Sequence, residues 1–425
     1  MSIPSVLIVA GLVCAVGTAC SAQEAAGGLT AREKQLLERI AKLEERVAAL
    51  EGRAGGSAPQ AEPPAPAAAA AKETARPAPV ETPVGTVSVY FDGYYGWNTN
   101  RPAGRVNQLR AYDVTSNGFS INQTGILMEK APDLESGRRW GYRLDLMYGQ
   151  ATETLQGSGL NEPRANAYRP VFQAYGTYVA PLGRGLTVDF GKWASALGYE
   201  GNYTKDQINY SRSYFFNFLP FYHMGVKTSY SLNERVSVGY WLVNGVNQTE
   251  DFNGAKSQLA QVVVKPVKTL SWTLQYYSGQ EQASPARGRT HIVDTYAAWA
   301  PGKLTLAGEL DYVVSRTQPN SAPQRVTGGA AYLRYQLTPR LYAGQRYARL
   351  HDVAGFFSGT AQNLNDLTST LGYRFGEGFE TRLEYRRDFS NVPYFLTSDP
   401  GKLNEAQNTV ALGLLWWFGG KQGAW

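Results

Sequence analysis

The 425-residue chain is poor in charge and in cysteine, and it has no long apolar run beyond its N-terminus. Charged residues make up 18% of it, against about 25% in an average soluble domain. Without a further apolar run of about 18 residues, a membrane protein built from several helices is excluded. Both cysteines, Cys14 and Cys20, lie near the start of the chain. The rest of the chain therefore has no disulfide framework and no cysteine-ligated metal site.

Histidine and recognisable catalytic motifs are also scarce. The three histidines, His223, His291 and His351, are widely spaced, and the chain has no G-x-S-x-G, no metal-ligand cluster and no phosphate-binding loop. A lipase or protease at a barrel rim needs a His paired with Ser or Asp. His351, Asp352 and Ser358 are close in sequence, and such neighbours seldom form a triad. We predict no enzyme, no catalytic residues, no metal, no cofactor and no nucleic-acid partner.

The N-terminus has the composition of an export signal. Residues 3–19 form one apolar run that is followed by small residues, a pattern typical of secretory signal peptides. We predict a signal peptide at residues 1–22, cleaved after Ala22, with cleavage after Ala19 as an alternative. A lipid-modified Cys20 and a retained membrane anchor are two further alternatives.

Residues 23–53 carry a short heptad pattern. Apolar residues recur at spacings of four and three, as in the a/d seam of a coiled coil: Leu36, Ile40, Leu43, Val47 and Leu50. β-Branched residues at a with leucine at d favour a dimer, whereas Leu37 at e permits a trimer. We predict homo-oligomerisation through this segment, with a single solvated helix as the alternative interpretation.

Residues 54–84 are rich in Ala, Pro and Gly, with APQAEPPAPAAAA near their centre. A segment of this composition cannot bury a core and is typical of a semi-extended linker. At ~3.1 Å per residue in polyproline geometry it reaches roughly 90 Å. We expect it to join the oligomerising helix to a domain at residues 85–425.

That domain is a succession of short segments with period-two alternation. In the first of them, Phe91, Tyr95 and Trp97 share one face, and Tyr90 and Asp92 share the other. Such alternation predicts half-buried β-strands. Sixteen segments show it, beginning near residues 86, 118, 139, 170, 185, 219, 235, 257, 270, 289, 303, 325, 340, 365, 378 and 407.

Short turns alternate with long connections along this series. Turns such as 181–185 and 376–378 are brief, whereas 98–117, 195–218 and 389–406 are much longer. An even number of strands, with short turns on one side and long loops on the other, predicts an all-β transmembrane barrel. We expect about sixteen antiparallel strands in the lipid of a bacterial outer membrane, with the N-terminal segment in the periplasm.

Several sequence motifs resemble those of the OmpL-like β-barrel porins, a family of bacterial outer-membrane proteins. The resemblance runs from about residue 87 to 418, and the following motifs carry it: FDGYYGWNTNRP (91–102), NQLRAYD (107–113), EKAPD (129–133), GLTVDFGKW (185–193), NYSRSYFF (209–216), PFYHMGVK (220–227) and LVNGVN (242–247). The family has no well-defined substrate, so the resemblance implies pore architecture rather than a particular cargo.

The resemblance also implies a constriction inside the barrel. In general porins the loop after the fifth strand folds inward, and here that loop is 195–218. Carried over by topology, its candidate constriction residues are Glu200, Lys205, Asp206 and Arg212. The alternative interpretation is an ordinary external loop that covers a subunit contact.

The expected inner wall has an excess of basic charge. Residues 1–84 hold 8 of the 41 Lys and Arg and 9 of the 35 Asp and Glu, so the barrel region holds 33 and 26, a net charge of +7. Arg143 and Asp145 are expected to face the pore, as is a series of later arginines: Arg334, Arg346, Arg374, Arg382 and Arg386. A basic strip raises the local concentration of anions.

We expect this strip to lie across the pore from the inward loop, where Glu200 and Asp206 complete a transverse field. Acidic residues share the inward face, namely Glu309, Asp311, Glu380 and Glu384. A network of wall ion pairs is therefore an equally consistent interpretation.

Together these patterns predict an oligomeric outer-membrane porin for passive diffusion of small hydrophilic solutes and ions, with a weak preference for anions. Two alternatives remain open. One is a phosphate-type anion-selective porin, and the other is a non-conducting tether between the outer membrane and the cell wall.

Overall fold

The computed structural model describes residues 80–82, 85–156, 162–283, 286–376 and 378–419. The predicted signal peptide, coiled coil and most of the linker lie outside the described residues. The chain divides into two compact units, Met1–Gln60 and Ala61–Trp425, and every described residue belongs to the second.

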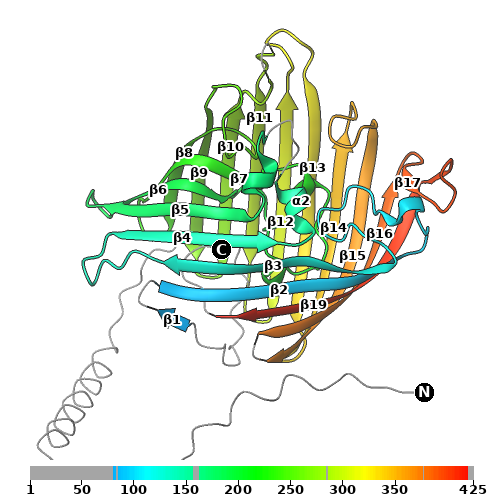
Figure 1. The fold of residues 1–425 in the computed structure, drawn as a ribbon, viewed down its shortest axis with the longest axis horizontal. Coiled ribbons are helices and arrows are strands. Elements are labelled where there is room, and N and C mark those ends of the chain that lie inside the picture. Colours follow the sequence, from blue (N-terminus) through cyan, green and yellow to red (C-terminus); the bar gives the residue numbers. More distant parts are fainter. Residues whose placement is uncertain (1–79, 83–84, 157–161, 284–285, 377, 420–425) are drawn as a thin grey trace, which may run out of the picture. The chain divides into compact units, whose positions relative to one another are not determined.

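Sixteen of the described strands form an antiparallel barrel (Figure 1). They are β2 (Gly85–Asn98), β3 (Gly118–Lys130), β4 (Trp140–Tyr148), β5 (Val171–Ala180), β6 (Leu186–Ala194), β7 (Tyr222–Ser231), β8 (Val236–Val243), β9 (Ser257–Val267), β10 (Leu270–Gly279), β11 (Thr290–Trp299), β12 (Leu304–Ser315), β13 (Gln324–Gln336), β14 (Leu341–Asp352), β15 (Gln362–Gly376), β16 (Phe379–Ser390) and β19 (Ala406–Phe418). Each of the sixteen strand starts predicted from the sequence falls within three residues of an observed start. The sequence prediction of the barrel is confirmed.

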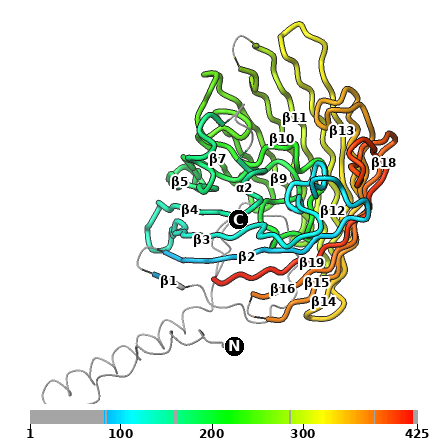
Figure 2. Tube along the Cα trace, turned by 45° about the vertical axis from the view of Figure 1, so that its right-hand side comes forward, coloured from blue at the N-terminus to red at the C-terminus, as the bar shows by residue number. Residues whose placement is uncertain are grey.

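The barrel closes where its last strand pairs with its first. In Figures 1 and 2, β19 lies beside β2, and the two strands pair from Thr409 opposite Asn98 to Phe418 opposite Val89. The short strand β1 (Val80–Thr82) pairs with the start of β2. Closure satisfies the backbone of every barrel strand on both sides, as a sheet that spans lipid requires.

The two faces of the barrel have opposite polarity. On β2 the outward Phe91, Tyr95 and Trp97 are exposed, while the inward Tyr90 and Asp92 are buried. Along β16, by the same alternation, the outward side chains are mostly apolar, with Arg387 as an exception, and the inward ones are mostly charged. The apolar side chains therefore face lipid and the polar ones face the lumen, the reverse of a soluble protein.

Connections at one end of the barrel are short, and those at the other end are long. The turns 181–185, 232–235 and 337–340 contrast with the loops 149–170 and 195–221. The loops contain α2 (Ala151–Leu155), α3 (Ala165–Tyr168), η1 (Ala103–Arg105), η2 (Thr204–Asp206) and η3 (Phe215–Asn217), and the hairpin of β17 (Phe395–Leu396) and β18 (Leu403–Asn404). Within the described residues, no helix has the length and apolarity to cross a bilayer.

Part of the lumen is filled by a packed core. The loop 195–221 between β6 and β7, called the inward loop below, contributes Tyr214, Phe215 and Leu219 to it. These side chains pack with inward residues such as Trp193 and Trp241 of the barrel wall. The fold thus positions the inward loop against the inner wall.

Candidate functional site

The candidate site is the contact between the inward loop and the inner face of the barrel. Hydrogen bonds join the loop to strands on several sides of the lumen. Tyr210 donates from its hydroxyl to Asp92 Oδ1 on β2 (2.6 Å) and from its backbone N–H to Glu384 Oε2 on β16 (2.6 Å). Gln123 of β3 donates to the carbonyl of Asn202 (2.7 Å). The loop therefore lies inside the barrel.

Two strands of the wall, β14 and β16, present buried arginines to this loop. We call Arg346 of β14 with Arg382 and Arg386 of β16 the arginine wall; each side chain is no more than 1% exposed. Arg382 Nη1 donates to the carbonyls of Thr204 (2.8 Å) and Asn209 (3.1 Å). Arg386 Nη1 donates to the carbonyl of Arg212 (2.5 Å). The arginine wall thus binds backbone carbonyls of the loop directly.

Carboxylates neutralise the arginine wall. Arg346 lies between Glu200 of the loop (Nη1 to Oε1, 2.9 Å) and Asp366 of β15 (Nε to Oδ1, 2.9 Å). Within β16, both arginines of the wall pair with a carboxylate two positions away, Arg382 with Glu380 (2.6 Å) and Arg386 with Asp388 (2.7 Å). A buried charge is tolerated only when it is paired and hydrogen-bonded in this way.

This arrangement corrects one expectation from the sequence. The basic strip was expected across the pore from the inward loop, with Glu200 on the opposite side of a transverse field. Instead Glu200 forms an ion pair with Arg346, and the loop backbone rests on the arginine wall. Carboxylates and carbonyls of the loop contact the arginines because the loop packs on β14–β16. The expected transverse field across an open pore therefore does not form between Glu200 and the arginine wall.

Arg212 holds the inward loop in its own conformation. Its Nε donates to the carbonyl of Gly201 (3.0 Å) and its Nη1 to that of Tyr210 (2.8 Å). The guanidinium lies 4.5 Å from the ring centre of Tyr112, a cation–π contact. Burial lowers the pKa of the guanidinium of Arg212. The side chain is 1% exposed, so Arg212 is a structural residue of the loop.

Arg143 and Asp145 face inward from β4, which is separated from β16 by β19, β2 and β3. Asp145 accepts a hydrogen bond from the hydroxyl of Tyr203 in the loop, and Arg143 pairs with Glu129 of β3 (3.3 Å). Both residues are buried. They anchor the first half of the loop on the β3–β4 side of the barrel.

Four of the predicted residues keep partial exposure. Lys205 and Asp206 form an ion pair within η2 of the loop (2.9 Å), with side-chain exposures of 13% and 37%. On the wall, Arg374 is 38% exposed beside Glu380 (2.9 Å), and the partly exposed Arg334 stacks on Tyr342 at 4.4 Å. These side chains can meet water and ions, whereas the arginine wall cannot.

The sequence analysis did not identify the wall glycines that leave room for side chains of the inward loop. A Cβ on Gly413 of β19 would lie 2.4 Å from the ring of Tyr210, and one on Gly344 of β14 would lie 2.6 Å from Ile208. Both glycines are on inward positions, so the absent side chains create room for the loop. The period-two alternation of the strands predicts that these glycines face the lumen, but no local pattern shows which side chain of the loop each glycine contacts.

Lys227 is a further partly exposed inward cation that the sequence prediction did not include. It lies on β7, 3.0 Å from Asp189 of β6 and within 6 Å of the rings of Trp193 and Trp241. The period-two pattern of β7 could have predicted that Lys227 faces the lumen.

The barrel architecture and the inward loop define the class of protein: a β-barrel porin. The chain belongs to the family described as "Putative beta-barrel porin-2, OmpL-like", whose match covers residues 85–418. This confirms the resemblance seen in the sequence motifs, and the family is one of bacterial outer-membrane proteins. No curated protein sequence matches the chain.

Solved porin structures share the fold at low sequence identity. An anion-selective porin from Comamonas acidovorans is similar with a TM-score of 0.54 and 11% identity, over 78% of this chain and 99% of that one. OmpT of Vibrio cholerae (TM-score 0.49, 12% identity, 80% and 100% coverage) and OmpF of Salmonella typhi in complex with daunomycin (0.49, 12%, 79% and 98%) are also similar. At these identities the likeness with the Comamonas porin concerns the fold alone.

Proposed function

We propose that this porin passes small hydrophilic solutes and ions by passive diffusion, with a weak preference for anions. Its N-terminal segment lies in the periplasm. The observation that carries the proposal is the division of inward charges into two groups. Arg346, Arg382 and Arg386 are buried in ion pairs, whereas other cationic side chains of the lumen keep partial exposure.

The exposed group supports weak selectivity rather than a substrate-specific site. Lys205, Lys227, Arg334 and Arg374 are its cations. Asp206, Asp189 and Glu380 lie beside three of them and offset part of their charge. Partly compensated charges act over about 8–10 Å at physiological salt. They bias ion entry without selecting one solute.

Conductance in a planar bilayer tests the proposal. Folded protein, recognised by its heat-modifiable migration in electrophoresis, is expected to produce stepwise ohmic current, and detergent without protein is the control. Folded protein that produces no current steps would refute the pore and favour the cell-wall tether, which co-sedimentation with peptidoglycan detects. Saturation of the current by phosphate, but not by chloride, would favour the phosphate-type porin.

A further inference from the structure

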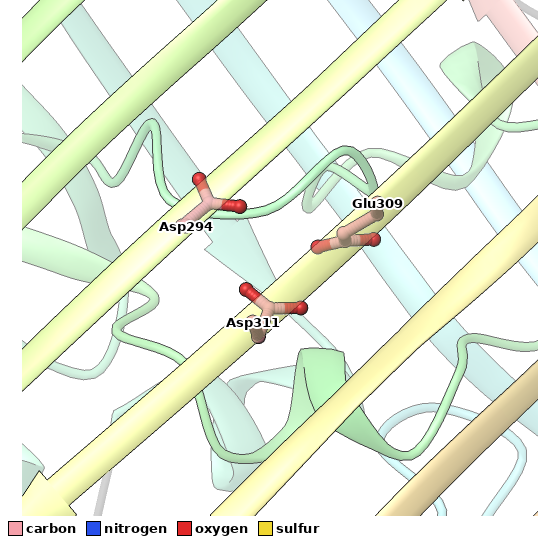
Figure 3. Close-up of side chains that lie close together, drawn as sticks. All are labelled: Asp294, Glu309 and Asp311. Carbon is pink, nitrogen blue, oxygen red and sulfur yellow. The ribbon is translucent and has the colours of Figure 1, made fainter.

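Three carboxylates meet on the inner wall at the point where the inward loop begins. Asp294 of β11 lies directly opposite Asp311 of β12 in the strand register, and Glu309 precedes Asp311 by two residues on the same face. Figure 3 shows their carboxylate groups gathered beside the two strands. Ligand oxygens of all three lie within 4.8 Å of one another. We call Asp294, Glu309 and Asp311 the acid cluster.

The acid cluster is buried, and several of its oxygens have no hydrogen-bond partner. Asp294, Glu309 and Asp311 are 0%, 5% and 4% exposed. Both carboxylate oxygens of Asp311 and Oδ1 of Asp294 lack a hydrogen-bond partner. Among the described residues, none of the three carboxylates forms an ion pair with Lys, Arg or His. Burying such groups without compensation is costly.

The remaining contacts of the cluster favour ionised carboxylates. Asp294 Oδ2 accepts from the backbone N–H of Gly198 (3.0 Å) and from the amide of Gln275 (2.8 Å). Glu309 accepts from the backbone N–H of Tyr199 (3.1 Å) and the hydroxyl of Tyr332 (3.1 Å). Every one of these groups donates, and donors bind a charged carboxylate more strongly than a neutral one. Burial and mutual repulsion oppose ionisation of all three carboxylates at once, so either bound protons or a cation must offset their charge.

We propose that the acid cluster binds one divalent cation, with Ca²⁺ preferred, which fixes the start of the inward loop to β11 and β12. Carboxylate oxygens are the ligands of hard cations. Ca²⁺ accepts an irregular set of such oxygens, whereas Mg²⁺ demands near-octahedral geometry and retains several waters. The free oxygens of Asp294 and Asp311 together with Glu309 supply the protein ligands. This site departs from the sequence expectation of no metal, because only the strand register brings Asp294 opposite Asp311.

Terbium luminescence tests the site on the folded, full-length protein in detergent. Tb³⁺ replaces Ca²⁺ at oxygen-ligated sites, and its emission is sensitised by nearby tyrosines. Tyr199, Tyr296 and Tyr332 pack together beside the cluster. We expect saturable binding of about one Tb³⁺ per chain, displaced by Ca²⁺ at lower concentration than by Mg²⁺.

Two variants distinguish this site from surface binding. Asp311→Asn is expected to weaken Tb³⁺ binding by at least about tenfold, because ligand charge sets the affinity of such sites. Asp206→Asn removes an exposed carboxylate of the same loop and is expected to leave binding unchanged. If Asp311→Asn does not fold, Asp294→Asn and the Ca²⁺-dependent rise in the unfolding temperature of the wild type serve instead.

Absence of saturable binding to folded wild-type protein would overturn the proposal, as would equal binding by the wild type and Asp311→Asn. Preferential displacement of Tb³⁺ by Mg²⁺ would overturn the preference for Ca²⁺. Binding is measured without any current. Failure of this site and failure of the pore are therefore separate results.

Discussion

Exposure decides what each inward arginine can do to a passing ion. Arg382 is buried and bonded to Glu380 and to two loop carbonyls, so its charge is balanced where it stands. Removing one partner of such a buried pair costs about 3–5 kcal/mol, because the other charge remains unpaired. Substitutions in the arginine wall therefore report on folding, and selectivity has to be tested at the exposed positions.

The double variant Arg334→Gln and Arg374→Gln is expected to move ion preference toward cations. Two partly exposed positive charges are lost. An interaction of about 0.5–1 kcal/mol for each charge corresponds to a change of about twofold to fivefold in relative permeability per charge, and about fivefold to thirtyfold for both. Reversal potentials in a KCl gradient measure the change.

Arg387→Gln is the matched control for this prediction, since Arg387 lies on β16 but points outward. Its reversal potential is expected to equal that of the wild type. An unchanged potential in the double variant would mean that Arg334 and Arg374 do not line the conducting path.

At the scale of elements, the inward loop fits the barrel because glycines of the wall leave room for its side chains. Tyr210 packs on Gly413 of β19, and Phe215 packs on Gly328 of β13, where an added Cβ would lie 2.4 Å from each ring. The Tyr210 ring cannot shift freely, because its hydroxyl donates to Asp92 and its backbone N–H to Glu384. The glycine positions and the loop aromatics form one complementary surface.

Gly413→Val is expected to displace Tyr210 and with it the middle of the inward loop. Overpacking of this kind costs about 1–3 kcal/mol, which urea unfolding followed by tryptophan fluorescence measures. Single-channel conductance is expected to change as well, because the loop then occupies a different part of the lumen.

Gly308→Val is the control for this substitution. Gly308 lies on the outward face of β12, where an added Cβ meets nothing nearer than a backbone oxygen at 3.9 Å. Stability and conductance are expected to remain at wild-type values. If Gly413→Val behaves like Gly308→Val, the loop does not rest on β19 at Tyr210.

The sequence predicts the strands well because alternation is a local property. The faces on which Phe91 and Asp92 lie can be predicted from the residues two positions away, and the same is true along the other barrel strands. The path of the inward loop is not local, since Glu200 meets Arg346 only after residues far apart in sequence come together. The same is true of Asp294 and Asp311, whose proximity depends on strand register. The sequence therefore predicts which face of a strand a side chain occupies, but it does not predict which distant residue that side chain contacts.

At the scale of the whole molecule, we expect residues 23–53 to drive self-association. Arg39 and Arg46 at g, with Glu44 and Glu51 at e, pair between parallel chains in a coiled coil. Deleting residues 23–53 is expected to weaken the oligomer that chemical cross-linking and sedimentation detect.

A double substitution, Ile40→Glu and Val47→Glu, keeps the length of the chain and disrupts only the seam. It is expected to reproduce the deletion. An oligomer of unchanged size and stability in both variants would assign the association to the barrel instead.

The contacts of Tyr210 also constrain the order of assembly. Its two wall partners, Asp92 and Glu384, lie 118 residues before it and 174 residues after it. They stand on β2 and β16, and β19 pairs with both of these strands. The complete binding surface for Tyr210 therefore exists only once the two ends of the sheet have met. Bringing such distant residues together costs loop-closure entropy, which the pairing of the intervening strands reduces. The inward loop can therefore take its final position only after the last strand of the barrel has paired with the first.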